Sequence, residues 1–266
     1  MDEKREFIAL LFDGYKKRKE ENRLYTRDDK VPKIIISEYL KLVGKPAFSN
    51  LISLYKKNYI ACESRVEPNF TKEEEKGLGD VYDYIQDFDF NKDKFNVFVV
   101  SLIIHSKLYA YCADGSFGGK LRQTTAVLQD VNIEIPTAED AKRIFNSYIQ
   151  KGDYILEKFK NKDYFGYIED CIRLNVDLIK LQPFADGNKR TFRSLTNLLL
   201  KILNIPPIYI PAKERDEYKK ALITAMNDNN YDDIIQFYYY KICDAIITLD
   251  IKNSEILNEN EKHNHL

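Results

Sequence analysis

The sequence predicts an all-α fold. Its ten glycines and eight prolines, among 266 residues, gather between segments whose apolar residues recur with helical spacing. One stretch, residues 114–136, combines glycines with β-branched residues and stands apart from this pattern. The length is sufficient for one large domain or two small ones.

The helical patterns follow one another along the chain. Thr71 and Glu74 form a capping-box sequence, which marks the start of a helix that runs to about residue 86. Residues 91–111 predict a strong apolar helix. Pro206 and Pro207 end a later helix, because proline cannot continue an α-helix. The other predicted helices cover residues 7–15, 34–42, 49–60, 138–159, 164–181, 191–203, 215–226 and 231–251.

The exceptional stretch predicts a short β-hairpin. Three glycines precede residues 121–128, and residues 131–136 alternate and carry β-branched side chains. The run Gly115 to Lys120 superficially resembles a phosphate-binding loop. Its glycine spacing does not fit the G-x-x-x-x-G-K-[ST] pattern, and Leu121 stands where that pattern needs Ser or Thr.

Composition narrows the class of protein. Lysine and arginine total 41 against 42 aspartates and glutamates, which argues against a general nucleic-acid binder. The four cysteines are far apart, without a C-x-x-C pair, so neither a zinc site nor a disulfide framework is predicted. The N-terminus does not resemble a signal peptide, and the longest apolar run, residues 98–104, is too short to span a membrane. We expect a cytoplasmic protein with no membrane partner.

Candidate chemistry is concentrated in residues 182–193. Gly187 permits a tight turn, and the helix after it would begin with backbone N–H groups that lack a helical partner and bind phosphate readily. Arg190 and Arg193 share one helical face, and each can donate to phosphate in pairs. Asp186 repels anions, but a carboxylate beside phosphates is a usual ligand of Mg²⁺. The alternative is an ordinary helix start with Asp186 as its cap and a solvated basic face.

The dodecamer resembles the signature of the Fic (fido) family, H-x-F-x-[DE]-G-N-[GK]-R-x-x-R. The resemblance implies a Fic-type helical bundle with a short β-hairpin flap, and it implies ATP and Mg²⁺ as cofactors. It assigns Phe184 to the core and Asp186 to the metal. The residues that it assigns to the phosphates are Gly187, Asn188, Lys189, Arg190 and Arg193.

Gln182 departs from that signature, because it stands where the family has its catalytic histidine. An amide does not titrate near neutrality and cannot take a proton from the target hydroxyl. Losing a positioned general base typically costs roughly 10²–10⁴-fold in rate. His263 and His265 lie in a polar tail, and His105 lies in an apolar run that predicts a structural role. The sequence leaves open whether Gln182 is the native residue.

Two further segments resemble parts of the same family. Gly119 to Arg122 resembles the G-x-x-R stretch before the flap, which would pair with an extended target segment through main-chain hydrogen bonds. An ordinary surface hairpin is the alternative. The residues that the resemblance assigns to the flap and the target are Leu121, Arg122, Thr124 and Thr125.

Residues 63–69 resemble the family's inhibitory motif, [ST]-x-x-x-E-[GN], with Glu67 at the glutamate position. Glu67 would pair with Arg193 and withhold it from ATP, in a charge-assisted bond worth roughly 1.5–3 kcal/mol. Glu63 and Pro68 depart from the motif at its hydroxyl and small positions. The alternative is a solvated loop acid.

These patterns predict three regions and leave three functions open. We expect a helical extension over residues 1–58, a Fic-like domain over 59–250 with a flap at about 114–136, and a polar tail over 251–266. The first function is transfer of AMP from ATP to a hydroxyl of a partner protein, impaired by Gln182. The alternatives are an inactive protein that binds nucleotide or a protein, and phosphoryl transfer of the Doc type, which Lys189 favours. Homodimerisation is left open.

Overall fold

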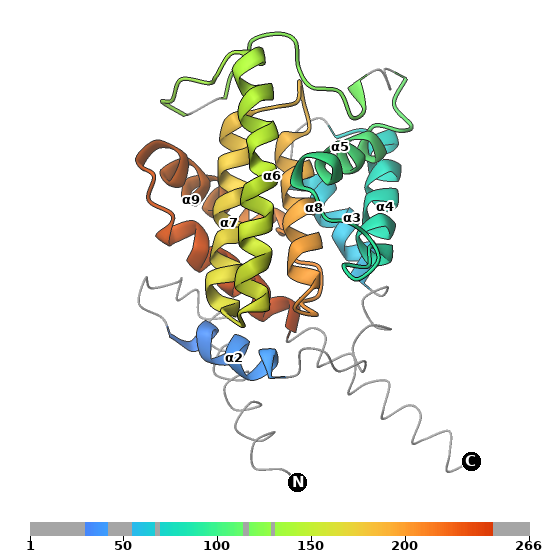
Figure 1. The fold of residues 1–266 in the computed structure, drawn as a ribbon. Coiled ribbons are helices and arrows are strands. Elements are labelled where there is room, and N and C mark those ends of the chain that lie inside the picture. Colours follow the sequence, from blue (N-terminus) through green and yellow to red (C-terminus); the bar gives the residue numbers. More distant parts are fainter. Residues whose placement is uncertain (1–29, 42–54, 67–69, 114–116, 129–130, 247–266) are drawn as a thin grey trace, which may run out of the picture.

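The computed structural model describes residues 30–41, 55–66, 70–113, 117–128 and 131–246 (Figure 1). Helices dominate these residues and no β-strand occurs among them, which confirms the all-α class. The helices are α2 (Val31–Leu40), α3 (Lys56–Val66), α4 (Lys72–Asp87), α5 (Val97–Leu108), α6 (Ala138–Lys160), α7 (Tyr164–Leu181), α8 (Asn188–Lys201) and α9 (Arg215–Asp228), with a short 3₁₀ helix η3 (Ala212–Glu214). Residues 232–246 form a further helix.

Helix α8 lies at the centre of the bundle. The long hairpin of α6 and α7 runs along one side, α3, α4 and α5 lie on the other, and α9 packs beyond α7 (Figure 1). Nearly every residue of α8 is buried, from Asn188 to Leu200. Since a helix surrounded by other helices can present functional groups only at its ends, the start of α8 becomes the place to look for a site.

The loop between α7 and α8 is pinned against α5. Phe184 is fully buried and stacks on the His105 ring, with centroids 3.9 Å apart and planes 8° apart. His105 Nδ1 accepts a hydrogen bond from the Gly119 amide at 3.0 Å. His105 Nε2 lies 3.0 Å from the Asp186 carbonyl oxygen, to which it must donate because Nδ1 is an acceptor. The core position of Phe184 and the structural role of His105 are thereby confirmed.

The predicted β-hairpin is not found in the described parts of residues 114–136. Residues 117–128 and 131–136 contain turns and extended chain without strand pairing. Arg122 holds this segment instead: Nε donates to the Gln182 carbonyl at 2.6 Å, Nη1 to that of Thr124 at 2.7 Å, and Nη2 to that of Pro136. An isolated two-stranded ribbon is marginally stable, so one buried guanidinium can set the path of the chain.

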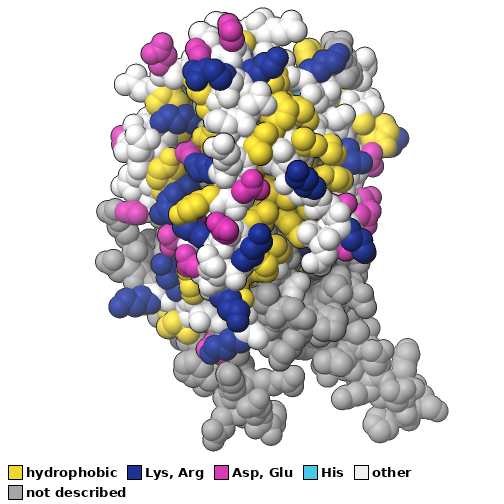
Figure 2. Space-filling view, viewed as in Figure 1, with side chains coloured by type: hydrophobic (Ala, Val, Ile, Leu, Met, Phe, Trp, Pro, Cys, Tyr) yellow, Lys and Arg dark blue, Asp and Glu magenta, His cyan; other side chains and the backbone are white. Residues whose placement is uncertain are grey.

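Other predicted helices occur with shifted boundaries, and some predicted segments lie outside the described residues. The capping box is present: Thr71 Oγ1 accepts from the Glu74 amide at 3.1 Å, and Glu74 Oε2 accepts from the Thr71 amide at 2.9 Å. Residues 7–15 and the polar tail lie outside the described residues. No helix in the described part of the chain is long and apolar enough to cross a membrane. Figure 2 shows acidic and basic side chains interspersed over one face, as the balanced charge predicts.

Candidate functional site

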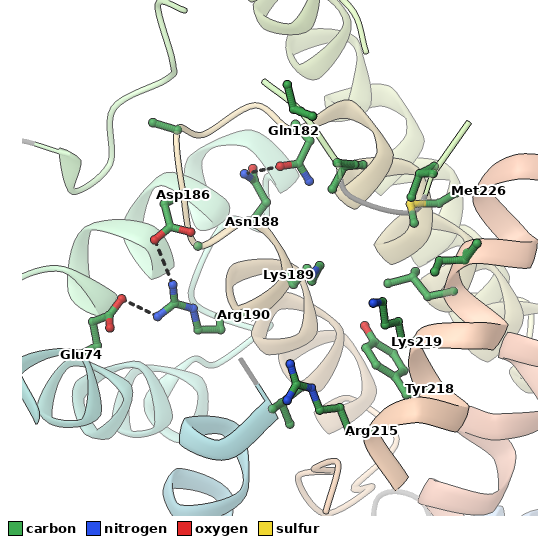
Figure 3. Close-up of a pocket in the computed structure, with 18 residues that line it drawn as sticks. Glu74, Gln182, Asp186, Asn188, Lys189, Arg190, Arg215, Tyr218, Lys219 and Met226 are labelled. Atoms are coloured by element: carbon green, nitrogen blue, oxygen red, sulfur yellow. Dashed lines mark hydrogen bonds and ion pairs between the residues drawn. The ribbon is translucent and has the colours of Figure 1, made fainter. Parts of the chain in front are cut away.

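The first turn of α8 opens into a cavity of about 490 Å³ (Figure 3). One wall is formed by the α7–α8 loop and α8, and the opposite wall by α9. Val127, Leu128 and Val131, from the segment before α6, also line it. The lining includes half of the site residues predicted from sequence, namely Gln182, Asp186, Gly187, Asn188, Lys189 and Arg190.

The turn that starts α8 needs glycine for two reasons. Gly187 has a φ of +70°, in the left-handed region that β-carbon-bearing residues rarely adopt. A Cβ on Gly187 would also lie 2.8 Å from the Tyr109 ring. No side chain of the described residues caps the helix, and the first backbone bond of α8 runs from the Thr191 amide to the Gly187 carbonyl at 2.9 Å. The backbone N–H groups before Thr191 have no acceptor within the helix, and a helix start of this kind suits the binding of an anion.

Asp186 is the one predicted metal ligand, and it lies at the mouth of the cavity with 75% of its side chain exposed. Tyr109 donates to Asp186 Oδ2 at 2.9 Å, and Arg190 Nη2 approaches the same oxygen at 3.3 Å. Partial burial opposes ionisation, but Arg190, the Gly187 amide and Tyr109 together lower the pKa of Asp186, so it is ionised at neutral pH.

The number of carboxylates at the site limits which metal ion could bind there and how it would be coordinated. No group of three or more His, Cys, Asp or Glu that could hold a metal ion occurs among the described residues. A single carboxylate fits Mg²⁺ that takes its other ligands from phosphate and water, and it does not fit a metal held by protein alone.

Arg190 is buried and is one of the residues that line the cavity. It forms an ion pair with Glu74 of α4, and its Nη2 donates to the Tyr109 hydroxyl at 3.0 Å. Burial opposes the charge of Arg190, but Tyr109, Glu74 and Asp186 outweigh it and raise the pKa of its guanidinium. Glu74, which sequence reasoning used only as a helix cap, is thus also the counter-ion of a site arginine.

Arg193 does not line this cavity, although the sequence predicted it beside Arg190. Its side chain is 4% exposed, and its Nε donates to Glu63 Oε2 of α3 at 2.8 Å. Glu67, the predicted partner, lies outside the described residues. Tyr59, Glu63 and Val66 form the buried face of α3, and this helical spacing was a signal that Glu63 points inward.

Gln182 occupies the catalytic position of the signature with both ends of its amide engaged. It caps α7 with a φ of 48°, and its Nε2 donates to the Ile179 carbonyl at 2.6 Å. Its Oε1 accepts from Asn188 Nδ2 at 3.0 Å, and Asn188 Oδ1 in turn accepts from the Phe184 amide at 2.9 Å. The glutamine therefore fastens the loop and offers no titrating group to the cavity.

The α9 wall contains residues to which the sequence assigned no site role. Arg215 and Lys219 contribute charge, while Leu222, Ile223 and Met226 make an apolar surface. The four predicted flap residues differ among themselves: Arg122 is buried by its backbone contacts, Leu121 is half-buried, and Thr124 and Thr125 are exposed. None of these four lines the cavity among the described residues.

Residues 99–200 match the Fic/DOC family. The chain is 31% identical over 120 residues to the protein adenylyltransferase Fic of Nematostella vectensis. The aligned segment covers 45% of this chain and 25% of that protein. The chain is 31% identical over 99 residues to the protein adenylyltransferase fic-1 of Caenorhabditis elegans, covering 33% of this chain and 18% of that protein. The chain thus spans about a quarter or less of these two relatives.

Solved structures show the same fold. A fragment of Fic-1 from Caenorhabditis elegans superposes with a TM-score of 0.62 at 17% identity, covering 83% of this chain and 69% of that one. A signalling protein with a Fic domain from Bacteroides thetaiotaomicron gives a TM-score of 0.61 at 17% identity, covering 81% and 94%. The motif lies within residues 99–200, so this part of the chain is similar to the Fic/DOC family in sequence, and the described residues share the fold of solved Fic structures.

Proposed function

We propose that this chain binds ATP with Mg²⁺ and is related in function to enzymes that transfer AMP to a hydroxyl group of a protein. The observation that carries the proposal is the start of α8, an uncapped helix end inside a 490 Å³ cavity. Lys189 lies in its first turn and Asp186 stands beside it. Two relatives bear the name protein adenylyltransferase.

Each wall of the cavity has a part in this proposal. The α8 amides and Lys189 would bind the phosphates, and Asp186 would hold Mg²⁺, which would neutralise phosphate charge during transfer. Leu222, Ile223 and Met226 offer an apolar surface that suits a nucleobase. Exposed Thr124 and Thr125 belong to the segment that would guide a protein target.

Gln182 argues that transfer is slow or absent. Its amide donates to the Ile179 carbonyl and accepts from Asn188, and it cannot act as a base toward an attacking hydroxyl. The second candidate function is therefore nucleotide binding without catalysis. Phosphoryl transfer of the Doc type remains a third candidate, favoured by Lys189.

We also propose that the protein is auto-inhibited through Glu63 in place of Glu67. Glu63 pairs with Arg193 deep between α3 and α8, so this guanidinium is withheld from the cavity. Release of Glu63 would free Arg193 for the outer phosphates.

Label transfer from ATP tests the proposal. The full chain is incubated with Mg²⁺, a cell lysate and ATP labelled at either the α- or the γ-phosphate. Wild type should transfer little label, and Gln182→His should transfer α-label at least roughly 100-fold faster, because a general base is restored. Histidine tolerates the left-handed backbone found at Gln182.

Gln150→His, at an exposed position of α6, is the matched control and should leave transfer unchanged. Transfer of γ-label alone would favour the Doc-type reaction. Binding of ATP by calorimetry without transfer by any variant would favour the inactive binder. Absence of both binding and transfer would refute the proposal.

A further inference from the structure

The cavity has a second cationic wall, and its charges are distributed unevenly. The charged residues that line it, within the described part of the chain, are Glu74, Asp186, Lys189, Arg190, Arg215 and Lys219. Both acids contact the same residue, Arg190. The cationic residues Lys189 of α8 and Arg215 and Lys219 of α9 border the remaining space between these two helices.

Arg215 is the first residue of α9 and is half-buried. Its guanidinium forms no hydrogen bond or ion pair with any other described residue. The preceding acid, Glu214, is buried and forms an ion pair with Lys241, so it does not neutralise Arg215. A guanidinium that lines a cavity and has no counter-ion among the described residues is available to bind an anionic ligand.

The position of Arg215 in the cavity suits the binding of a phosphate group. Arg215 and Lys219 are four residues apart on one helical face, and in Figure 3 both extend from α9 toward α8. The two helix starts thus contribute cations to one space from opposite sides. A phosphate chain that begins at the α8 amides would extend toward α9 as it fills this space.

We propose that Arg215 binds the terminal phosphate of this chain, the role that the signature assigns to Arg193. Arg193 is committed to Glu63 and lies outside the cavity lining, whereas Arg215 lies in it. The inference rests on the proposed function for the identity of the ligand as a nucleoside triphosphate. The shared chemistry is a phosphate group, which could also come from free pyrophosphate.

Calorimetry on the full chain with ATP, AMP and pyrophosphate tests the assignment. Arg215→Gln should weaken ATP binding roughly tenfold or more, since a charge-assisted bond is lost, and should leave AMP binding unchanged. Arg215→Lys keeps the charge without the fork and should give an intermediate loss. Lys213→Ala, at an exposed site of η3, removes the same charge and should have no effect. Thermal unfolding of each variant verifies that it is folded.

The affinities of the wild type and the variants distinguish failure of the Arg215 assignment from failure of the proposed function. Unchanged ATP affinity in folded Arg215→Gln, or equal losses for ATP and AMP, would overturn the assignment to the terminal phosphate. If wild type binds pyrophosphate in an Arg215-dependent way but does not bind ATP, the anion site stands and the nucleotide function fails. If wild type binds neither, both proposals are wrong.

Discussion

His105 shows how one buried side chain can join three parts of the site. Its ring stacks on Phe184, accepts from the Gly119 amide and donates to the Asp186 carbonyl, so α5, the segment before α6 and the α7–α8 loop meet at one imidazole. The two hydrogen bonds fix the tautomer with the proton on Nε2. A second proton on Nδ1 would break the bond from Gly119, so the folded structure requires the neutral form.

This requirement predicts a pH-dependent stability. Burial lowers the pKa of His105 from its ordinary 6.5 to about 4, although the Asp186 carbonyl opposes the shift. Between these two values the unfolded chain binds a proton that the folded chain excludes, so stability is full above pH 6.5 and falls as the pH drops toward 4. The loss attributable to His105 should be roughly 3 kcal/mol.

Urea unfolding of wild type and His105→Gln, in buffer without divalent cations, isolates this contribution. Glutamine lacks the titration, while the carboxylates of both proteins respond alike. The variant is expected to be less stable at pH 7 and to lose less stability on acidification. Parallel curves from pH 7 to pH 4.5 would show that His105 is not the titrating group.

For individual residues, the local role of a site residue was easier to predict than the distant residue that it contacts. Gly187 and Phe184 were predicted because each has one local reason, a left-handed turn and a buried ring. The partners of Arg190 and Arg193 lie 116 and 130 residues away, and no local pattern specifies which carboxylates will meet them.

Helices α4 and α5 approach each other unusually closely at Gly77. A Cβ at this position would lie 2.1 Å from the Leu108 carbonyl oxygen, a backbone atom that cannot rotate away. Glu74, one turn earlier on α4, reaches Arg190 from the position that this contact sets. The glycine therefore matters to the site as well as to packing.

Two alanine substitutions on α4 should have opposite effects. Gly77→Ala should destabilise the fold by about 1–3 kcal/mol, because the helices must separate to admit the methyl group. Gly79→Ala meets only side-chain atoms at 3.7 Å and should stabilise α4 by up to about 1 kcal/mol through higher helix propensity. Chemical denaturation measures both. Equal effects of the two variants would mean that the close contact does not constrain the helices.

Helix existence was predictable because buried faces impose a period on the sequence, whereas helix ends depend on individual caps. The predicted helix over 91–111 begins only at Val97, where Asn96 Oδ1 accepts from the Val99 amide at 3.1 Å. The β-hairpin was wrong for the described residues because alternation alone does not provide a partner strand, and Arg122 determined the path instead.

Across the whole molecule, α8 is held by one carboxylate from each of two helices on the same side. Glu74 of α4 binds Arg190 and Glu63 of α3 binds Arg193, and both pairs are almost fully buried. The first pair faces the cavity and the second does not. Removing one partner of a buried pair leaves an uncompensated charge, which typically costs about 3–5 kcal/mol.

The Glu63 pair therefore predicts opposite changes in stability and in affinity. Glu63→Gln should lower the free energy of unfolding by about 3 kcal/mol or more, because Arg193 loses its counter-ion. It should also strengthen ATP binding roughly tenfold, because the released guanidinium can reach the phosphates. Glu75→Gln, at an exposed position of α4, should change stability by less than about 0.5 kcal/mol and leave affinity unchanged.

The double variant Glu63→Gln with Arg193→Gln separates the two effects. Replacing both ions by neutral groups of similar shape removes the stranded charge, so much of the lost stability should return. The gain in ATP affinity should disappear, because no guanidinium remains to be released. If the double variant still binds ATP more tightly than wild type, the gain does not come from Arg193, and Glu63 is a structural counter-ion and not an inhibitory one.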